Sequence, residues 1–148
     1  MVQQKNSMKE KLFVANKAVI VNEKNEILLI QENPDDPIRS HPKKWDVVGG
    51  RMDMWETPQE SLLREIHEEV GIDVEIGRPI YVADWRPSPV PDEKWQIIGI
   101  FYYARAKSTD ITLSGEHMNY AWVALDTIDE YNIIDQAKQA ILKIKHPD

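Results

Sequence analysis

The segment from Thr57 to Gly71 constrains this chain most, because it carries the start and stop signals of a helix around a strongly patterned interior. Thr57 can cap the helix N-terminus, and Pro58 suits its first position. Glu60 stands three residues after the cap, where a carboxylate can complete a capping box. Gly71 can supply the left-handed residue that ends a helix. These signals predict a helix over residues 58–70.

The predicted helix has an apolar face beside an acidic one, because successive helical residues are separated by roughly 100°. The apolar face consists of Leu62, Leu63, Ile66 and Val70, and the acidic face consists of Glu65, Glu68 and Glu69. Like charges at this spacing repel by roughly a few tenths of a kcal/mol per pair, so the acidic face requires either water or a bound cation. Mg²⁺ and Mn²⁺ prefer oxygen ligands and commonly bind carboxylates together with substrate phosphates.

A longer stretch, from Gly50 to Ile72, fits the pattern Gly-x5-Glu-x7-Arg-Glu-U-x-Glu-Glu-x-Gly-U, where U is aliphatic. Its specified positions are Gly50, Glu56, Arg64, Glu65, Ile66, Glu68, Glu69, Gly71 and Ile72. This stretch resembles the signature of the Nudix hydrolases, complete at every specified position. Family members often have proline before the two glycines and glycine before the first Glu, whereas Val48 and Trp55 occupy those places here. The shape of the loop at Trp55 stays open, since tryptophan does not readily accept the positive φ that glycine allows.

The resemblance to Nudix hydrolases implies an α/β fold with a mixed sheet, arranged as an α/β/α sandwich. It implies hydrolysis of a nucleoside diphosphate linked to another moiety, with metal-activated water attacking phosphorus and Mg²⁺ or Mn²⁺ as the cofactor. Glu65, Glu68 and Glu69 would be the metal carboxylates, and the backbone carbonyl of Gly49 would add a ligand. Glu116 is a candidate further ligand or general base, with a solvated loop glutamate as the alternative. The base varies within the family, so we leave it unassigned.

Four further assignments follow for residues around these carboxylates. Arg64 and Glu56 resemble the family's supporting pair, in which the guanidinium holds the loop carboxylate and fixes the helix start. A planar guanidinium suits that task better than lysine. Asp53 is expected to serve the loop rather than a metal. Trp55 is the candidate for stacking on a nucleobase, because it belongs to the loop beside the carboxylates. His117 is expected to be a bystander.

The rest of the chain predicts strands and helical segments around the 58–70 helix. Strands are expected at 12–21, 27–31, 74–85, 95–105 and 120–125, a helical turn at 126–131 and a helix over 133–145. The first two strands should form a hairpin, and 32–44, 86–93 and 107–118 should be loops. The 32–44 loop either flanks the substrate or is a plain surface connection. Without repeats or linkers, residues 1–148 are expected to form one domain, with 1–10 as a flexible lead.

Composition excludes several classes of protein. The net charge of -7 disfavours nucleic-acid binding, which depends on Lys and Arg neutralising phosphates. The absence of cysteine excludes disulfides, thiolate catalysis and sulfur-ligated zinc. No signal peptide is evident, and no apolar run approaches the roughly 18 residues of a membrane span. We therefore expect a cytoplasmic enzyme that acts on a small-molecule nucleotide, contacts no membrane, and exists as a monomer or homodimer.

The substrate remains a choice among alternatives. The leading hypothesis is a nucleoside triphosphate, in intact or oxidised form, as in MutT-like members of the family. ADP-ribose or a nucleotide sugar is the runner-up, because the signature binds the diphosphate rather than the base or sugar. A protein of another class, an inactive Nudix module that senses nucleotides, is disfavoured by the intact acidic residues. The isomerase members of the fold rely on a cysteine that this chain lacks, and mRNA decapping would ordinarily call for a basic surface.

Overall fold

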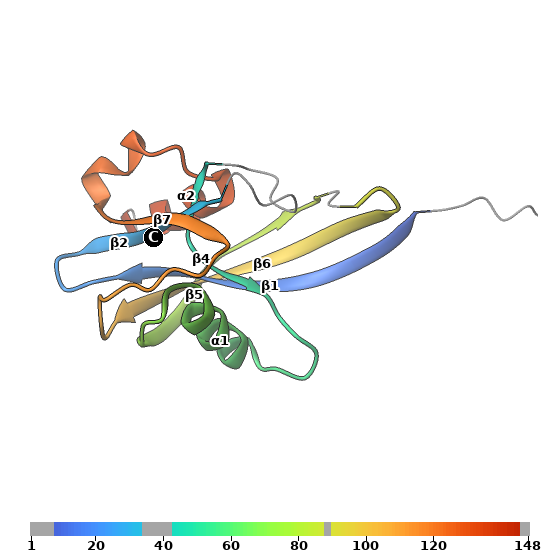
Figure 1. Ribbon diagram of the computed structural model, residues 1–148, viewed down its shortest axis with the longest axis horizontal. Helices are drawn as coiled ribbons and strands as arrows, with labels where there is room; N and C mark the ends of the chain where they lie inside the picture. The colour runs from blue at the N-terminus through green and yellow to red at the C-terminus, as the bar shows by residue number, and fades with distance from the viewer. Residues whose placement is uncertain (1–7, 34–42, 88–89, 146–148) are drawn as a thin grey trace, which may run out of the picture.

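The computed structural model describes residues 8–33, 43–87 and 90–145, which form a curled sheet with helices on both faces (Figure 1). The strands are β1 Lys9–Val21, β2 Glu26–Glu32, β3 Trp45–Asp46, β4 Val48–Arg51, β5 Val74–Trp85, β6 Glu93–Ala106 and β7 His117–Ala124. The helical elements are α1 Pro58–Val70, the short 3-10 helix η1 Leu125–Glu130, and α2 Asp135–Lys145. Helix α1 packs on one face, and η1 and α2 pack on the other. The predicted α/β/α sandwich with a mixed sheet is confirmed.

Strand β1 is the central connection of the sheet, whose strand order is β3-β2-β1-β6-β5 with β4 paired to β1 and β7 paired to β2. β1 runs parallel to β6 from Lys9 opposite Glu93 to Val21 opposite Arg105. The predicted hairpin forms, with Val21 opposite Ile27, but β2 then takes β7 as its main partner. Along the edge of β1 away from β6, β1 also pairs with β4, around Asn16 opposite Gly50. β1 therefore places the glycines of β4 directly in front of α1.

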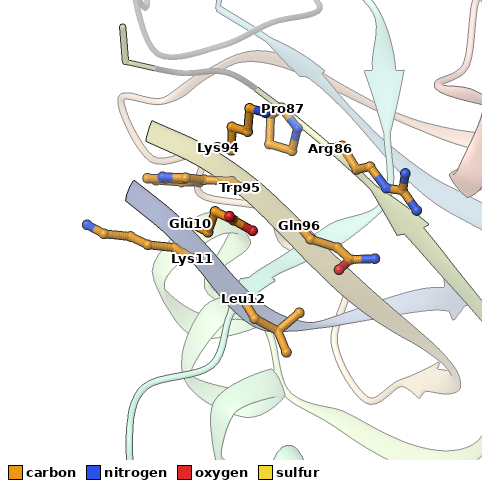
Figure 2. A pocket seen from close by; sticks show the side chains of 8 residues that line it. All are labelled: Glu10, Lys11, Leu12, Arg86, Pro87, Lys94, Trp95 and Gln96. Carbon is orange, nitrogen blue, oxygen red and sulfur yellow. The ribbon is translucent and has the colours of Figure 1, made fainter. Parts of the chain in front are cut away.

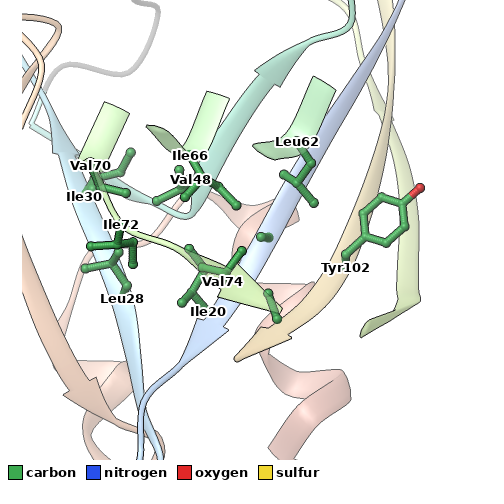
Figure 3. Packing of buried hydrophobic residues seen from close by; sticks show 12 residues of the cluster. Ile20, Leu28, Ile30, Val48, Leu62, Ile66, Val70, Ile72, Val74 and Tyr102 are labelled. Atoms are coloured by element: carbon green, nitrogen blue, oxygen red, sulfur yellow. The ribbon is translucent and has the colours of Figure 1, made fainter. Parts of the chain in front are cut away.

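The hydrophobic core has two layers because side chains alternate along each strand. In β1, Ile20 faces the α1 layer and Val19 faces the α2 layer. The side chains that α1 contributes are Leu62, Ile66 and Val70, all fully buried (Figure 3). Full burial of an aliphatic side chain contributes about 1.5–3 kcal/mol, so this row of residues fixes how α1 sits on the sheet.

Two residues of α1 differ from the predicted faces. Leu63, predicted to be apolar core, is 38% exposed, because the row at positions 62, 66 and 70 already fills the contact with the sheet. Glu69, predicted on the acidic face, is only 4% exposed. The acidic face therefore turns partly into the protein, toward β4.

Element boundaries follow the sequence closely where local signals are strong. The predictions for 58–70 and 74–85 are confirmed residue for residue. β1 begins at Lys9, so the predicted lead is shorter than ten residues, and residues 1–7 lie outside the described structure. β7 begins at His117, inside the segment predicted as loop, and α2 begins at Asp135, because Ile133 forms a bridge to Trp45. Glu32 belongs to β2, and residues 34–42 of the predicted loop lie outside the described residues.

Helices long and apolar enough to cross a membrane are absent from residues 8–33, 43–87 and 90–145.

Candidate active site

Helix α1 begins and ends as its sequence predicts. Thr57 Oγ1 accepts a hydrogen bond from the Glu60 N–H at 3.2 Å, and Glu60 Oε1 accepts one from the Thr57 N–H at 3.2 Å. Gly71 ends the helix with φ 68°. The loop before the helix keeps a left-handed turn even though it has tryptophan there: Trp55 has φ 73° and a side chain 94% exposed. The exposure lets the ring avoid the rest of the loop.

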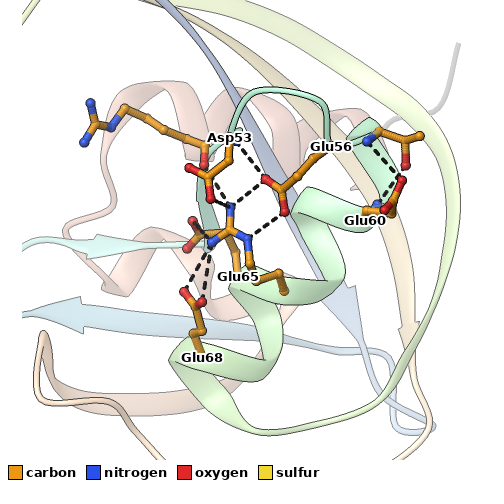
Figure 4. Close-up of polar contacts among 8 residues, drawn as sticks. Asp53, Glu56, Glu60, Glu65 and Glu68 are labelled. Atoms are coloured by element: carbon orange, nitrogen blue, oxygen red, sulfur yellow. Dashed lines mark hydrogen bonds and ion pairs between the residues drawn. The ribbon is translucent and has the colours of Figure 1, made fainter.

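Arg64 joins the loop to the acidic face of α1 (Figure 4). Its Nε donates to Glu56 Oε2 at 2.7 Å and its Nη2 donates to Glu56 Oε1 at 2.9 Å, which is a bidentate pair. Nη1 donates to Glu65 Oε1 at 3.1 Å and lies 3.3 Å from Glu68 Oε2. Nη2 also donates to the Arg51 carbonyl at 3.3 Å. The contact predicted between Arg64 and Glu56 is present, and one guanidinium reaches two of the predicted metal carboxylates.

The charge of Glu56 is fixed by these contacts. The hydrogen bond from Arg64, with one from the Asp53 N–H, lowers the pKa of Glu56 from 4.5 to about 2. Asp53 donates that N–H at 2.7 Å, while its own carboxylate is 72% exposed and lies 3.5 Å from Arg64 Nη2. Asp53 therefore shapes the loop, in agreement with the expected loop role.

Glu69 is the buried member of the acidic face. Its Oε1 accepts a hydrogen bond from the Gly49 N–H at 2.8 Å, and its Oε2 lies 3.3 Å from His117 Nε2. Burial raises the pKa of Glu69 from 4.5 to about 8, against the opposing effect of the Lys17 ammonium. Such a carboxyl favours the neutral form until a positive charge arrives beside it.

The glycines of β4 allow the helix to approach the sheet. A Cβ on Gly50 would lie 2.7 Å from the Glu65 carboxylate, and one on Gly49 would lie 2.3 Å from the Asn16 carbonyl oxygen. Gly49 also has φ 144°, which side chains rarely permit. Burial raises the pKa of Glu65, so close packing against Gly50 has an electrostatic consequence as well.

The donors for a cation come together at the junction of α1 and β7. Ligand atoms of Glu69, Glu116 and His117 all lie within 4.8 Å of one another. The structure therefore brings the predicted Glu116 to the α1 carboxylates. Carboxylate oxygens and an imidazole nitrogen are suitable donors for a divalent metal, so this donor set fits one. The expectation that His117 is a bystander is wrong, because its side chain is 2% exposed and contacts Glu69.

A cavity of about 790 Å³ opens beside these carboxylates. Its lining combines acidic residues, including Glu65, Glu68, Glu69 and Glu116, with apolar and aromatic residues, including Trp85, Val90, Trp95, Ile97 and Phe101. Trp55 does not line it, whereas Trp85 and Trp95 do, and base stacking by Trp55 stays a prediction. A second hollow, of about 610 Å³, lies at the outer ends of β1 and β6 and lacks such a carboxylate cluster (Figure 2).

The wall of the larger cavity holds a buried ion pair that sequence reasoning missed. Lys17 Nζ donates to Asp46 Oδ2 at 2.5 Å, and both side chains are 12% exposed. The Lys17 charge also acts on Glu69. The available sequence signal was Lys17 itself, which stands between Ala15 and Val19 on the odd-numbered face of β1.

Comparison with known proteins identifies the family of this chain. The NUDIX domain family matches residues 11–143. An 8-oxo-dGTP diphosphatase from Proteus vulgaris is 40% identical over 67 residues, which cover 45% of this chain and only 55% of that enzyme. A nucleoside triphosphatase NudI from Klebsiella pneumoniae (strain 342) is 30% identical over 98 residues, covering 62% of this chain and 70% of the relative.

Solved structures share the fold over nearly the whole chain. A MutT protein from Methanosarcina mazei Go1 superposes with a TM-score of 0.78 at 26% identity, covering 94% of this chain and 96% of that one. The dihydroneopterin triphosphate pyrophosphohydrolase of E. coli has a TM-score of 0.73 at 19% identity, covering 90% and 96%, which is a likeness of fold alone. Because the NUDIX domain match takes in residues 11–143 and the Gly50–Ile72 pattern is complete, this chain belongs to the Nudix hydrolase family.

Proposed function

We propose that this Nudix hydrolase cleaves a phosphoanhydride bond of a nucleoside triphosphate, with an intact or an oxidised base, by attack of water on phosphorus. The observation that carries the proposal is the cavity of about 790 Å³, whose lining combines the acidic cluster with aromatic side chains. Its size is ordinary for a site that encloses a small ligand. A nucleotide calls for both kinds of lining residue, because its phosphates bind through a cation held by carboxylates and its flat base can stack on an aromatic ring.

The carboxylates that line the cavity require positive charge beside them before phosphates can bind there. Nudix hydrolases generally need a divalent cation, and the donors gathered by α1 and β7 suit one. We infer Mg²⁺ or Mn²⁺, held by Glu65, Glu68, Glu69, Glu116 and the Gly49 carbonyl. When bound, such a cation supplies positive charge to the phosphates and makes water a better nucleophile at neutral pH.

The chain's own residues place this chemistry. The bidentate contact between Arg64 and Glu56 holds the loop against the start of α1, so that the carboxylates face the cavity in a fixed arrangement. Lys17, which lines the same cavity, contributes a fixed positive charge close to Glu69. Among the aromatic residues of the lining, Trp85 offers a ring on which a base can stack; stacking contributes about 1–3 kcal/mol per base.

A substrate panel tests the proposal. Purified protein with Mg²⁺ or Mn²⁺ is given ordinary and oxidised nucleoside triphosphates, ADP-ribose and a nucleotide sugar, and the products are identified by phosphorus NMR in ¹⁸O-labelled water. We expect a triphosphate to have the highest kcat/KM, with one ¹⁸O atom in a product phosphate.

Two variants give the panel its controls. Glu69→Gln should lose most turnover, whereas Glu75→Gln, at an exposed position of β5, should keep it. Preference for ADP-ribose would select the runner-up substrate class. Tight nucleotide binding without turnover of any substrate would indicate a sensing module instead.

We also propose a monomer or homodimer, which light scattering on the same preparation checks.

A further inference from the structure

His117 lies where the signature carboxylates meet the last strand of the sheet. It is the first residue of β7, and its side chain is 2% exposed. Its Nε2 lies 3.3 Å from Glu69 Oε2. The neighbouring Glu116 brings its own carboxylate to the same place. The cluster therefore combines oxygen donors with one aromatic nitrogen.

The backbone holds this nitrogen close to α1. The Ser114 N–H donates to the Glu69 carbonyl at 3.0 Å, and the His117 N–H donates to the Ser114 carbonyl at 3.3 Å. These two bonds tie the start of β7 to the last turn of α1. The position of the imidazole is thus set by the same helix that carries the carboxylates.

The spacing of the donors matches a shared ion closely. A metal about 2.1 Å from each ligand places two opposite ligands about 4.2 Å apart. The donor atoms of Glu69, Glu116 and His117 lie within 4.8 Å of one another. Rotations about the side-chain torsions can bring the three donors to the shorter spacing of neighbouring ligands.

We propose that His117 donates an imidazole nitrogen to the cation held by Glu69 and Glu116, and that this nitrogen makes the site select Mn²⁺ or Co²⁺ over Mg²⁺. The selection follows from donor chemistry, because Mg²⁺ is the hardest of these cations and binds oxygen ligands, whereas the affinity of a nitrogen-containing site for first-row metals is measurable at Mn²⁺ and rises toward Co²⁺. The inference rests on the proposed function only in taking the cluster to be a cation site. A histidine that merely orients Glu69 would support either metal equally.

Metal binding without substrate tests this inference. Calorimetric titration of Mn²⁺ and of Mg²⁺ into wild type and His117→Gln gives the ratio of the two affinities. Glutamine keeps an amide near the Nε2 position that can bond Glu69 but is a poor ligand. We expect Mn²⁺ affinity to fall at least about tenfold, within the roughly 10–100-fold range typical of lost metal-site partners, with Mg²⁺ affinity nearly unchanged.

A spectroscopic readout identifies the nitrogen directly. Pulsed EPR of the Mn²⁺-loaded wild type should show ¹⁴N modulation from a bound imidazole, and His117→Gln should lack it. His67→Gln is the matched control, because His67 is the other histidine in the described residues and is largely exposed beside Asp73. This control should keep both the modulation and the affinity ratio.

The outcomes separate this inference from the proposed function. Mn²⁺ binding by wild type without ¹⁴N modulation overturns the inference, leaves the cation site in place, and requires no variant to fold. Equal losses of Mn²⁺ and Mg²⁺ affinity in His117→Gln also overturn it, since they assign His117 to orienting Glu69. Failure of wild type to bind either cation removes the site itself and the proposed function with it.

Discussion

Glu69→Gln should stabilise the metal-free protein at neutral pH while it destroys activity. The carboxyl is 4% exposed, and its pKa is raised from 4.5 to about 8 by burial. The amide that replaces it has nearly the same shape, and its oxygen can still accept the Gly49 N–H. The substitution therefore removes the cost of ionising a buried acid and little else.

The size of the effect follows from proton linkage. Between its unfolded pKa of 4.5 and its folded pKa of about 8, Glu69 loses its proton on unfolding and keeps it when folded. The unfolded state then binds fewer protons, so stability falls as pH rises through this window, by about 1.36 kcal/mol per pH unit. From about pH 5 to about pH 8 the loss is about 3–4 kcal/mol, a large part of the roughly 5–15 kcal/mol of a typical domain.

Urea unfolding in the presence of a chelator measures this. The stability of wild type relative to Glu69→Gln should fall by about 3–4 kcal/mol between about pH 5 and about pH 8. Glu68→Gln is the control, because it changes a neighbouring carboxylate of the same helix, 59% exposed, and leaves Glu69 in place. A pH-independent difference between wild type and Glu69→Gln would refute the reasoning. With Mn²⁺ added at about pH 8, wild type should gain more stability than Glu69→Gln.

Three other predictions concern the same loop and helix. In a double-mutant cycle, the losses of kcat/KM in Arg64→Lys and Glu56→Gln should be clearly less than additive, because both changes break one bidentate contact. Strict additivity would show that the two residues act independently. The thermal midpoint should rise with Mg²⁺ or Mn²⁺ in wild type, since a ligand of the folded state stabilises it by mass action, and it should rise less in Glu65→Gln/Glu68→Gln. An undiminished rise in the double variant would place the cation elsewhere. Gly50→Ala should lower kcat by at least about tenfold, because the new Cβ would lie 2.7 Å from the Glu65 carboxylate and displace that carboxylate. A variant with wild-type kcat and unchanged metal affinity would show that Glu65 tolerates the shift.

Local signals account for what the sequence predicted well. The capping residues Thr57 and Glu60, the glycine at 71 and the apolar spacing within α1 all act over a few residues, and the helix appears with those bounds. The contact between Arg64 and Glu56 could be predicted for a different reason, because the family signature links these two positions, which their spacing along the chain alone does not connect.

The missed features depend on how distant segments meet. The burial of His117 depends on the point where β7 begins, and the preceding loop carries no strand pattern that marks it. The pair of Lys17 and Asp46 requires knowing that β1 and β3 border one cavity. Trp55 was placed by its distance along the chain from the carboxylates, yet its backbone turns the ring outward. Side-chain direction in a loop depends on backbone torsions that composition does not specify.

The parallel pairing of β1 with β6 has a consequence for how the chain is made. Lys9 lies opposite Glu93 and Val21 opposite Arg105, so β1 leaves the ribosome well before its longest partner exists. Until then, its apolar residues can be covered by β2, β4 and α1 but lack the strand that pairs with β1 along its whole length. Contacts between such distant segments slow folding, since the intervening chain must be ordered first. Nascent chains that stop before residue 105 should therefore be the form of this protein that engages chaperones most.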